Sequence, residues 1–258
     1  MTDEAAAPQE VTSKEAQEAH WAKPVSQLHI AHEVPADAIN LNVEGKRVAG
    51  MTGGFGKMWQ KTYRVRLDGA NVAPEQVVKV WKEHFPEFWK KGNRFFGPMA
   101  SISPGDVALI NVKTGGVKLS TGILVLYADD VSFSFMTPEG HMFNGLITFS
   151  ARDVDGVTEA QIDALIRAQD PIYEFGMTFL GGHGAENRQW LHVLRSLAGH
   201  FGVDGQPTVE RVCVDKKRQW KQFGNIRRSA AIRTVFYSVT RPLRRRGAKR
   251  SGNSMTGA

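Results

Sequence analysis

Residues 139–141 read Glu-Gly-His, which places a carboxylate and an imidazole two positions apart beside a turn. Such a pair can act as general acid and general base when both side chains face a substrate. In an extended segment this spacing would put Glu139 and His141 on one face. A polar hairpin turn with a surface histidine is the structural alternative. We therefore take Glu139 and His141 as candidate catalytic residues.

A second polar cluster consists of Asp170, Tyr173 and Glu174. Its composition is similar to that of the first cluster. However, an aspartate directly before a proline, here Pro171, is also a common way to begin a turn. A turn that begins at Asp170 therefore explains this cluster at least as well as a catalytic role does.

Two glycine-rich segments have a composition that could suit an anion or nucleotide site. Residues 181–187 (GGHGAEN) precede a predicted helix, whose first backbone amides can hold an anion. They form neither a Walker A sequence nor a complete dinucleotide fingerprint, and a flexible loop is the simpler interpretation. Residues 50–56 (GMTGGFG) lack the strand–turn–helix context that a dinucleotide site needs.

The sequence predicts no metal site and no cofactor. Its eight histidines include no HExxH motif, and His29 and His32 have ligand-like spacing without a placed carboxylate or second pair. No GxSxG elbow supports a serine nucleophile. The single cysteine, Cys213, excludes an intramolecular disulfide and shows no sign of activation.

Hydrophobic periodicity predicts the elements that would position these groups. The segment 158–169 has a helical composition, but its apolar residues alternate almost strictly, so we expect it to be the last strand of a meander. The predicted order is a strand at 61–67, a helix that begins at Pro74, strands at 106–112, 117–127, 131–137, 142–151 and 158–169, and an amphipathic helix at 185–201.

Large apolar side chains share one face of these strands and meet those of the long helix. A sheet packed on a helix needs such a core in any case. The alternative is an apolar ligand cavity between the two layers, with a few placed polar groups that include His141. The residues that we expect to line such a cavity are Tyr127, Phe133, Phe135, Met136, Phe143, Trp190 and Leu194.

The element order over residues 59–202 resembles the START/SRPBCC superfamily. Residues 136–150 (MTPEGHMFNGLITFS), 167–174 (RAQDPIYE) and 218–234 (RQWKQFGNIRRSAAIRT) are similar to a bacterial family of polyketide-cyclase-like proteins. The resemblance implies an α+β helix-grip fold, in which a curved antiparallel sheet surrounds a long C-terminal helix and leaves an apolar cavity. That fold also hosts cyclases, hydrolases, lipid carriers and ligand sensors, so it does not decide the function.

The net charge of +7 belongs to the last quarter of the chain. Residues 1–202 carry 19 Lys and Arg against 23 Asp and Glu, whereas residues 203–258 carry 14 against 3. Residues 223–239 are basic and amphipathic, and a cationic tail follows. The tail residues could contact an anionic membrane weakly, with nucleic acid less favoured; packing on the mildly acidic body or solvation is the alternative. They are Arg244, Arg245, Arg246, Lys249 and Arg250.

We expect a disordered N-terminal tail (1–24), an irregular leader (25–58), the helix-grip domain (59–202), a C-terminal helical extension (203–240) and a basic disordered tail (241–258). Without a signal peptide or a spanning apolar run, the expected location is cytoplasmic. The expected function is binding of a hydrophobic small molecule, as a non-catalytic carrier or sensor. The alternatives are a polyketide cyclase/aromatase-like enzyme that uses the same cavity, and a membrane-surface or nucleic-acid adaptor that acts through the tail.

Overall fold

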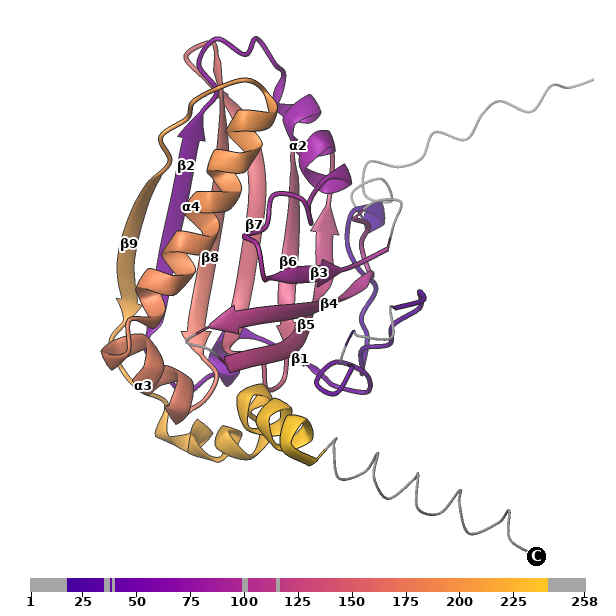
Figure 1. Ribbon diagram of the computed structural model, residues 1–258, viewed down its shortest axis with the longest axis vertical. Coiled ribbons are helices and arrows are strands. Elements are labelled where there is room, and N and C mark those ends of the chain that lie inside the picture. The colour runs from indigo at the N-terminus through magenta and orange to yellow at the C-terminus, as the bar shows by residue number, and fades with distance from the viewer. Residues whose placement is uncertain (1–17, 35–37, 39, 99–101, 115–116, 241–258) are drawn as a thin grey trace, which may run out of the picture.

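A computed structural model describes residues 18–34, 38, 40–98, 102–114 and 117–240, with the backbone alone for 113, 114, 117 and 118. Its centre is a nine-stranded antiparallel sheet in the order β3-β4-β5-β6-β7-β8-β2-β9, with β1 paired to β6 (Figure 1). The strands are β1 (Val48–Ala49), β2 (Met58–Arg66), β3 (Arg94–Phe96), β4 (Val107–Thr114), β5 (Val117–Ala128), β6 (Ser132–Pro138), β7 (Phe143–Val154), β8 (Val157–Ala168) and β9 (Thr208–Asp215).

The predicted last meander strand is confirmed as β8. Its whole length pairs with β7 on one side, and it pairs with β2 on the other. Neighbours on both sides satisfy its backbone groups, which outweighs the helical propensity of its residues. Ala160, Ile162 and Ala164 are buried on the face that the apolar alternation predicts.

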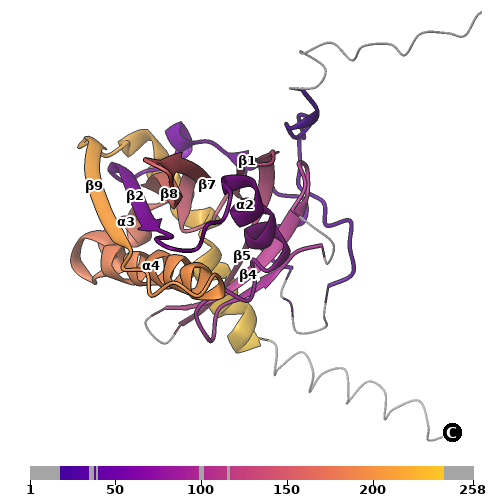
Figure 2. The ribbon, with the colours of Figure 1, turned by 90° about the horizontal axis from the view of Figure 1, so that it is seen from above.

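The helices are α2 (Pro74–Glu83), α3 (Pro171–Phe179) and α4 (Gly182–His200), with 3-10 turns η1 (Met51–Gly53) and η2 (Trp220–Arg228). The predicted helix starting at Pro74 and the predicted long helix are both confirmed, as α2 and α4. Figures 1 and 2 show α4 lying across one face of the curved sheet, with α2 over the same face near its end. This arrangement is the helix-grip α+β fold.

The main core fills the space between that face, α2 and α4. Its centre is an aromatic cluster in which Trp81 and Phe85 of the α2 region meet Phe133 and Phe149 of the sheet, with ring centroids 5.2–6.0 Å apart. Leu194 of α4 is fully buried beside it. Because aromatic pairs prefer such edge-to-face contacts, this cluster fixes how the helices sit on the sheet.

The N-terminal segments are more closely joined to the fold than expected. Within the expected disordered tail, residues 1–17 lie outside the described part. The amide of Ala22 donates to the Leu126 carbonyl at 2.8 Å, and Trp21 packs on Tyr127 with ring centroids 4.7 Å apart. In the leader, Leu28 and Val43 are buried in a second, smaller core on the opposite face of the sheet. These contacts place residues 20–22, 28 and 43 in the packed structure.

The C-terminal extension departs from the prediction of a purely helical segment. It begins with β9, which pairs antiparallel with β2 and so continues the sheet beyond residue 202. Without β9, the edge of β2 would expose unpaired backbone groups. The basic amphipathic segment at 223–239 does not form one helix: it is divided between η2 and a helix at 230–240. The chain breaks at Ser229 because the amide of Ala230 donates to the Gly140 carbonyl, at 2.8 Å, rather than within the helix.

The expected basic tail at 241–258 lies outside the described residues. Within the described part of the chain, the helices are too short or too polar to cross a bilayer.

Candidate functional site

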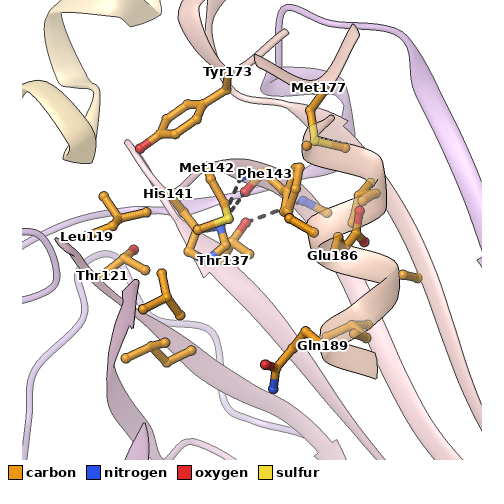
Figure 3. Close-up of a pocket in the computed structure, with 18 of the residues that line it drawn as sticks. Leu119, Thr121, Thr137, His141, Met142, Phe143, Tyr173, Met177, Glu186 and Gln189 are labelled. Atoms are coloured by element: carbon orange, nitrogen blue, oxygen red, sulfur yellow. Dashed lines mark hydrogen bonds between the residues drawn. The ribbon is translucent and has the colours of Figure 1, made fainter. Parts of the chain in front are cut away.

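A cavity of about 510 Å³ lies between the inner face of the sheet and the helices α3 and α4 (Figure 3). Strands β4 to β8 supply one wall and the two helices supply the other. The wall residues are mostly apolar, and they include Ile110, Ile123, Phe135, Phe143, Ile147, Ile166, Met177 and Trp190. The space is therefore suited to an apolar molecule rather than to a strongly hydrated one.

Four of the residues singled out from the sequence meet at this cavity. Phe135, Phe143 and Trp190 line it, and so does His141. Phe135 lies on β6, Phe143 on β7 and His141 in the turn between them, and the antiparallel pairing of β6 with β7 brings these elements side by side. Trp190 comes from α4.

The other four expected lining residues lie elsewhere. Phe133 and Leu194 are fully buried in the aromatic core beneath α2. Met136 is on the opposite face of β6 from Phe135, as strand alternation requires. Tyr127 follows a β-bulge, so it pairs with Ser134 and turns to the outer face, where its hydroxyl donates to Asp129 Oδ2 at 2.6 Å.

The part of the cavity wall that α3 supplies was not predicted from the sequence. This helix contributes Ile172, Tyr173 and Met177 to the lining. Asp170 caps its N-terminus, since Oδ1 accepts hydrogen bonds from the amides of Ile172 (2.8 Å) and Tyr173 (3.0 Å). An aspartate before a proline at the first helical position is a helix-start signal and could have revealed α3.

The polar cluster expected around Asp170 is divided between two places. Tyr173 lines the cavity, and its hydroxyl accepts a hydrogen bond from the Ala231 amide at 3.0 Å. Glu174 points away from the cavity: its Oε1 accepts from Arg218 Nε at 2.9 Å, and its Oε2 accepts from the Lys57 amide at 3.3 Å. Glu174 therefore connects α3 to Arg218 and to the residue before β2, while Asp170 caps the helix.

His141 is buried, at 8% exposure, and lines the cavity. Its Nδ1 lies 3.0 Å from both the amide nitrogen and the carbonyl oxygen of Phe143. Burial lowers the pKa of His141 to about 4, so the ring is neutral at pH 7. Either tautomer leaves Nε2 without a partner in the described part of the chain. A molecule in the cavity would therefore meet Nε2 as a hydrogen-bond donor or as an acceptor.

Glu139 does not share a face with His141, which corrects the expectation from their spacing. Gly140 between them has φ +87°, and this left-handed turn rotates the two side chains apart. Glu139 instead accepts from Arg47 Nη2 at 2.6 Å and from Arg228 Nη1 at 3.1 Å through the same oxygen. It joins the turn to the leader and to η2.

A buried ion pair at the α4 side of the cavity was not predicted. Glu186 lines the cavity, and its Oε2 accepts from Lys61 Nζ at 2.5 Å, with side-chain exposures of 8% and 0%. Lys61 also donates to Asn187 Oδ1 at 3.3 Å, as does the Tyr63 hydroxyl at 2.9 Å. A lysine within the apolar alternation of β2 was the available signal, because Trp59, Tyr63 and Val65 share its face.

Burial raises the pKa of Glu186 and lowers the pKa of Lys61, while the attraction between the two charges opposes both shifts. The second carboxylate oxygen, Oε1, accepts no hydrogen bond from any described residue. Glu186 can therefore accept a hydrogen bond from a ligand without losing its contact with Lys61.

Further polar groups are spaced along the walls. Thr121 Oγ1 is buried without a partner among the described residues, and Thr137 Oγ1 accepts from the Gly145 amide at 3.4 Å. Gln189 Oε1 accepts from Asn93 Nδ2 at 2.8 Å. Figure 3 shows Thr121, Thr137 and His141 on the sheet side, with Glu186 and Gln189 on α4 opposite.

No group of three or more potential metal-ligating side chains occurs among the described residues. His29 is exposed, and its Nδ1 lies 2.6 Å from Glu44 Oε1. The sulfur of Cys213 lies 3.6 Å from the carbonyl oxygen of Asp215.

The fold and the cavity together define a helix-grip protein with an apolar pocket between its sheet and its C-terminal helices. Neither family models nor curated proteins match the chain. Solved structures do match, among them the KanY protein (11% identity, 55% of this chain and 95% of that chain, TM-score 0.42). A START superfamily protein from Mycobacterium smegmatis matches with 19% identity over 57% and 98% of the two chains, at a TM-score of 0.37.

A di-domain ARO/CYC protein, StfQ from the steffimycin biosynthetic pathway, matches with 13% identity and a TM-score of 0.43. The match covers 56% of this chain and 50% of StfQ. Identities and TM-scores this low carry no argument about activity. The fold assignment stands on the strand order and on the position of α4 in this chain.

Proposed function

We propose that this protein binds a hydrophobic small molecule in the cavity beside α4, as a non-catalytic carrier or sensor. The observation that carries the proposal is the cavity itself: about 510 Å³ of space with mainly apolar walls. Cavities of this size class and composition are typical of small-molecule sites. A domain that needed a core alone would fill this space with side chains.

The ligand that fits these walls has an apolar body and at least one hydrogen-bonding group. His141 Nε2 and Glu186 Oε1 both lack partners among the described residues. Leaving such groups unpaired after an apolar ligand has displaced water is unfavourable. A hydroxyl or carbonyl on the ligand would satisfy one or more of them.

The surroundings of His141 favour a carrier or sensor over an enzyme. Efficient acid–base catalysis by histidine is helped by a carboxylate that orients the ring. Within the described residues, the ring of His141 contacts the backbone of Phe143, and Glu139 is held by two arginines. The geometry therefore supplies binding groups more clearly than a proton relay.

The alternative is a polyketide cyclase/aromatase-like enzyme that uses the same cavity. The observation in its favour is the neutral imidazole of His141 at the wall, which could move a proton to or from an enolisable substrate. Replacing His141 by Gln separates the two functions. Retained ligand affinity with loss of turnover supports the enzyme, whereas the absence of turnover in the unmodified protein supports the carrier.

The binding proposal is tested by filling the cavity. Ile147 lines it, and the next residue, Thr148, lies on the opposite face, where its hydroxyl bonds Ser134 at 2.8 Å. Ile147→Trp should weaken binding of a fluorescent fatty acid by at least about tenfold, since the indole occupies the ligand space. Thr148→Trp is the matched control and should bind as the unmodified protein does. Equal affinity for all three proteins would contradict the proposal.

A further inference from the structure

Helix α3 exposes apolar side chains on the side away from the sheet. Phe175 and Phe179 are 54% and 68% exposed, and their ring centroids are 5.1 Å apart. Ile172 and Leu180 extend the same apolar surface at the two ends of the helix. Residues spaced by three and four lie on one helix face, so α3 presents a continuous apolar stripe to its surroundings.

The helix at 230–240 has the same unusual orientation. Its small or polar residues Ala230 and Thr234 are buried against the body. Its larger apolar residues face outward with the spacing i, i+3, i+4, i+7; these are Ile232, Val235, Phe236 and Val239, at 45–68% exposure. A helix that served the body alone would bury this stripe.

Two exposed aromatic residues of η2 add to this surface. Trp220 is 69% exposed and stacks on Phe223, which is 50% exposed, with ring planes 15° apart. The buried ring of Phe55 supports both from beneath. Figure 1 shows α3, η2 and the helix at 230–240 gathered at one end of the sheet, the end away from α2. We call the exposed apolar residues of these three elements the apolar end face. They are Ile172, Phe175, Phe179, Leu180, Trp220, Phe223, Ile232, Val235, Phe236 and Val239.

The charges that accompany this face are mainly positive, although Glu139 pairs with Arg228 and Glu174 pairs with Arg218. Residues 216–240 contain seven Lys and Arg and no Asp or Glu. Of these, Lys216, Lys217, Lys221, Arg227 and Arg228 are exposed, and Arg228 is paired with Glu139 at 3.1 Å. The single acid of α3, Glu174, is buried and bound to Arg218 at 2.9 Å, so it offsets Arg218 but none of the exposed cations.

The apolar end face is continuous with the cavity. Ile172 and Ala231 line the cavity and also a groove that Ile232, Val235, Phe236 and Val239 complete. Leu180, which is 73% exposed, is likewise part of the cavity wall. A molecule that leaves between α3 and the helix at 230–240 would pass directly over the apolar end face.

We infer that the apolar end face docks on an anionic lipid bilayer, with Phe175, Phe179, Trp220 and Phe236 inserted at the interface. Exposed aliphatic and aromatic residues flanked by cations are the composition of interfacial membrane-binding helices. A second copy of the chain is a poorer occupant, because docking two such faces would bring like charges together. Docking would also turn the opening of the cavity toward the acyl chains, so that a ligand could pass between the cavity and the bilayer. This part of the inference rests on the proposed function.

The test is flotation of the full-length protein with vesicles of phosphatidylcholine, with and without phosphatidylglycerol. We expect binding to the anionic vesicles, weaker binding to the neutral ones, and loss of the difference at high salt. The triple variant Phe175→Gln/Phe179→Gln/Phe236→Gln should bind at least about tenfold more weakly. Val212→Gln/Val214→Gln is the matched control, because these two valines on β9 are each 48% exposed; it should bind normally.

A second variant that lacks residues 241–258 separates the face from the tail. Docking by the face predicts that this truncated protein keeps measurable binding, which the triple substitution then abolishes. Three results would overturn the inference: no binding of the unmodified protein to anionic vesicles, equal binding by the triple variant, or a dimer that the triple substitution dissociates without any vesicle binding. Preferential binding to duplex DNA over vesicles would also overturn it.

Binding of the fluorescent fatty acid in solution tests ligand binding in the cavity separately from membrane docking by the apolar end face. The triple variant should retain this binding, because none of its three residues lines the cavity. Vesicle binding without fatty-acid binding would refute the proposed function and leave the docking surface standing. The opposite result would refute the docking surface alone.

Discussion

The carbonyl of Gly140 accepts a 2.8 Å hydrogen bond from the amide of Ala230. This contact joins the turn between β6 and β7 to the start of the helix at 230–240. The turn carries His141, and the helix carries Ala231, and both residues line the cavity. One backbone contact therefore holds two parts of the cavity wall together, although they are far apart in sequence.

Replacing Gly140 by Ala should disrupt this contact. Its φ of +87° disfavours a side chain, and a Cβ would lie 2.1 Å from the Arg228 carbonyl oxygen. Gly69 is the matched control, with φ +81° and open space around its Cβ position. Gly69→Ala should cost about 1 kcal/mol through strain, and Gly140→Ala a further ~2 kcal/mol from the clash. Urea denaturation measures both; equal costs would mean that the close approach does not matter.

The buried ion pair of Lys61 and Glu186 should depend strongly on both partners. Lys61→Met leaves a buried carboxylate unpaired and should lower the free energy of unfolding by about 3–5 kcal/mol. The double variant Lys61→Met/Glu186→Gln removes both charges and should recover much of that loss. A double variant that is less stable than Lys61→Met alone would show that the pair is not coupled as described.

Burial of His141 predicts a pH dependence of stability. Its pKa is about 4 in the folded protein against 6.5 when unperturbed, so between these values the unfolded chain binds the additional proton. Stability is therefore complete above pH 6.5 and falls as the pH drops toward 4, by roughly 3 kcal/mol from this residue. His141→Gln should flatten that slope in thermal unfolding measured from pH 7 to 4. Parallel profiles for the two proteins would refute the assignment.

Glu139 should matter little for binding, in contrast to its prominence in the sequence. Its carboxylate is bound to two arginines with exposures of 54–63%, so Glu139→Gln should cost no more than about 1 kcal/mol. The affinity for a fluorescent fatty acid should be unchanged, as measured by titration. An affinity loss as large as that of Ile147→Trp would place Glu139 in the binding site after all.

Much of the fold follows from local sequence patterns. Alternation identifies β8 despite its helical composition, and Pro74 marks the start of α2, because period and proline geometry act within a few residues. Departures arise from non-local pairing. Tyr127 faces outward owing to a bulge that forms against β6, and β9 forms by pairing with β2, which is distant in sequence.

The site was predicted less completely than the fold, for the same reason. Phe135, Phe143 and Trp190 could be placed from strand and helix periodicity, whereas His141 reaches the cavity from the turn between β6 and β7. Glu186 could not, because its partner Lys61 lies on a distant strand and their contact exists only after β2 and α4 pack together. The outward apolar stripe on the helix at 230–240 likewise looks from sequence like a face that packs on the body.

Native mass spectrometry of the purified protein tests whether the cavity holds a hydrophobic ligand. We expect the unmodified protein and the Thr148→Trp control to carry a bound hydrophobic compound that is released on denaturation. Ile147→Trp should carry at least about tenfold less of it, because the cavity is filled. Ligand binding in the cavity is contradicted if the unmodified protein carries no such compound and takes up none from an added hydrophobic mixture, or if Ile147→Trp retains it in full.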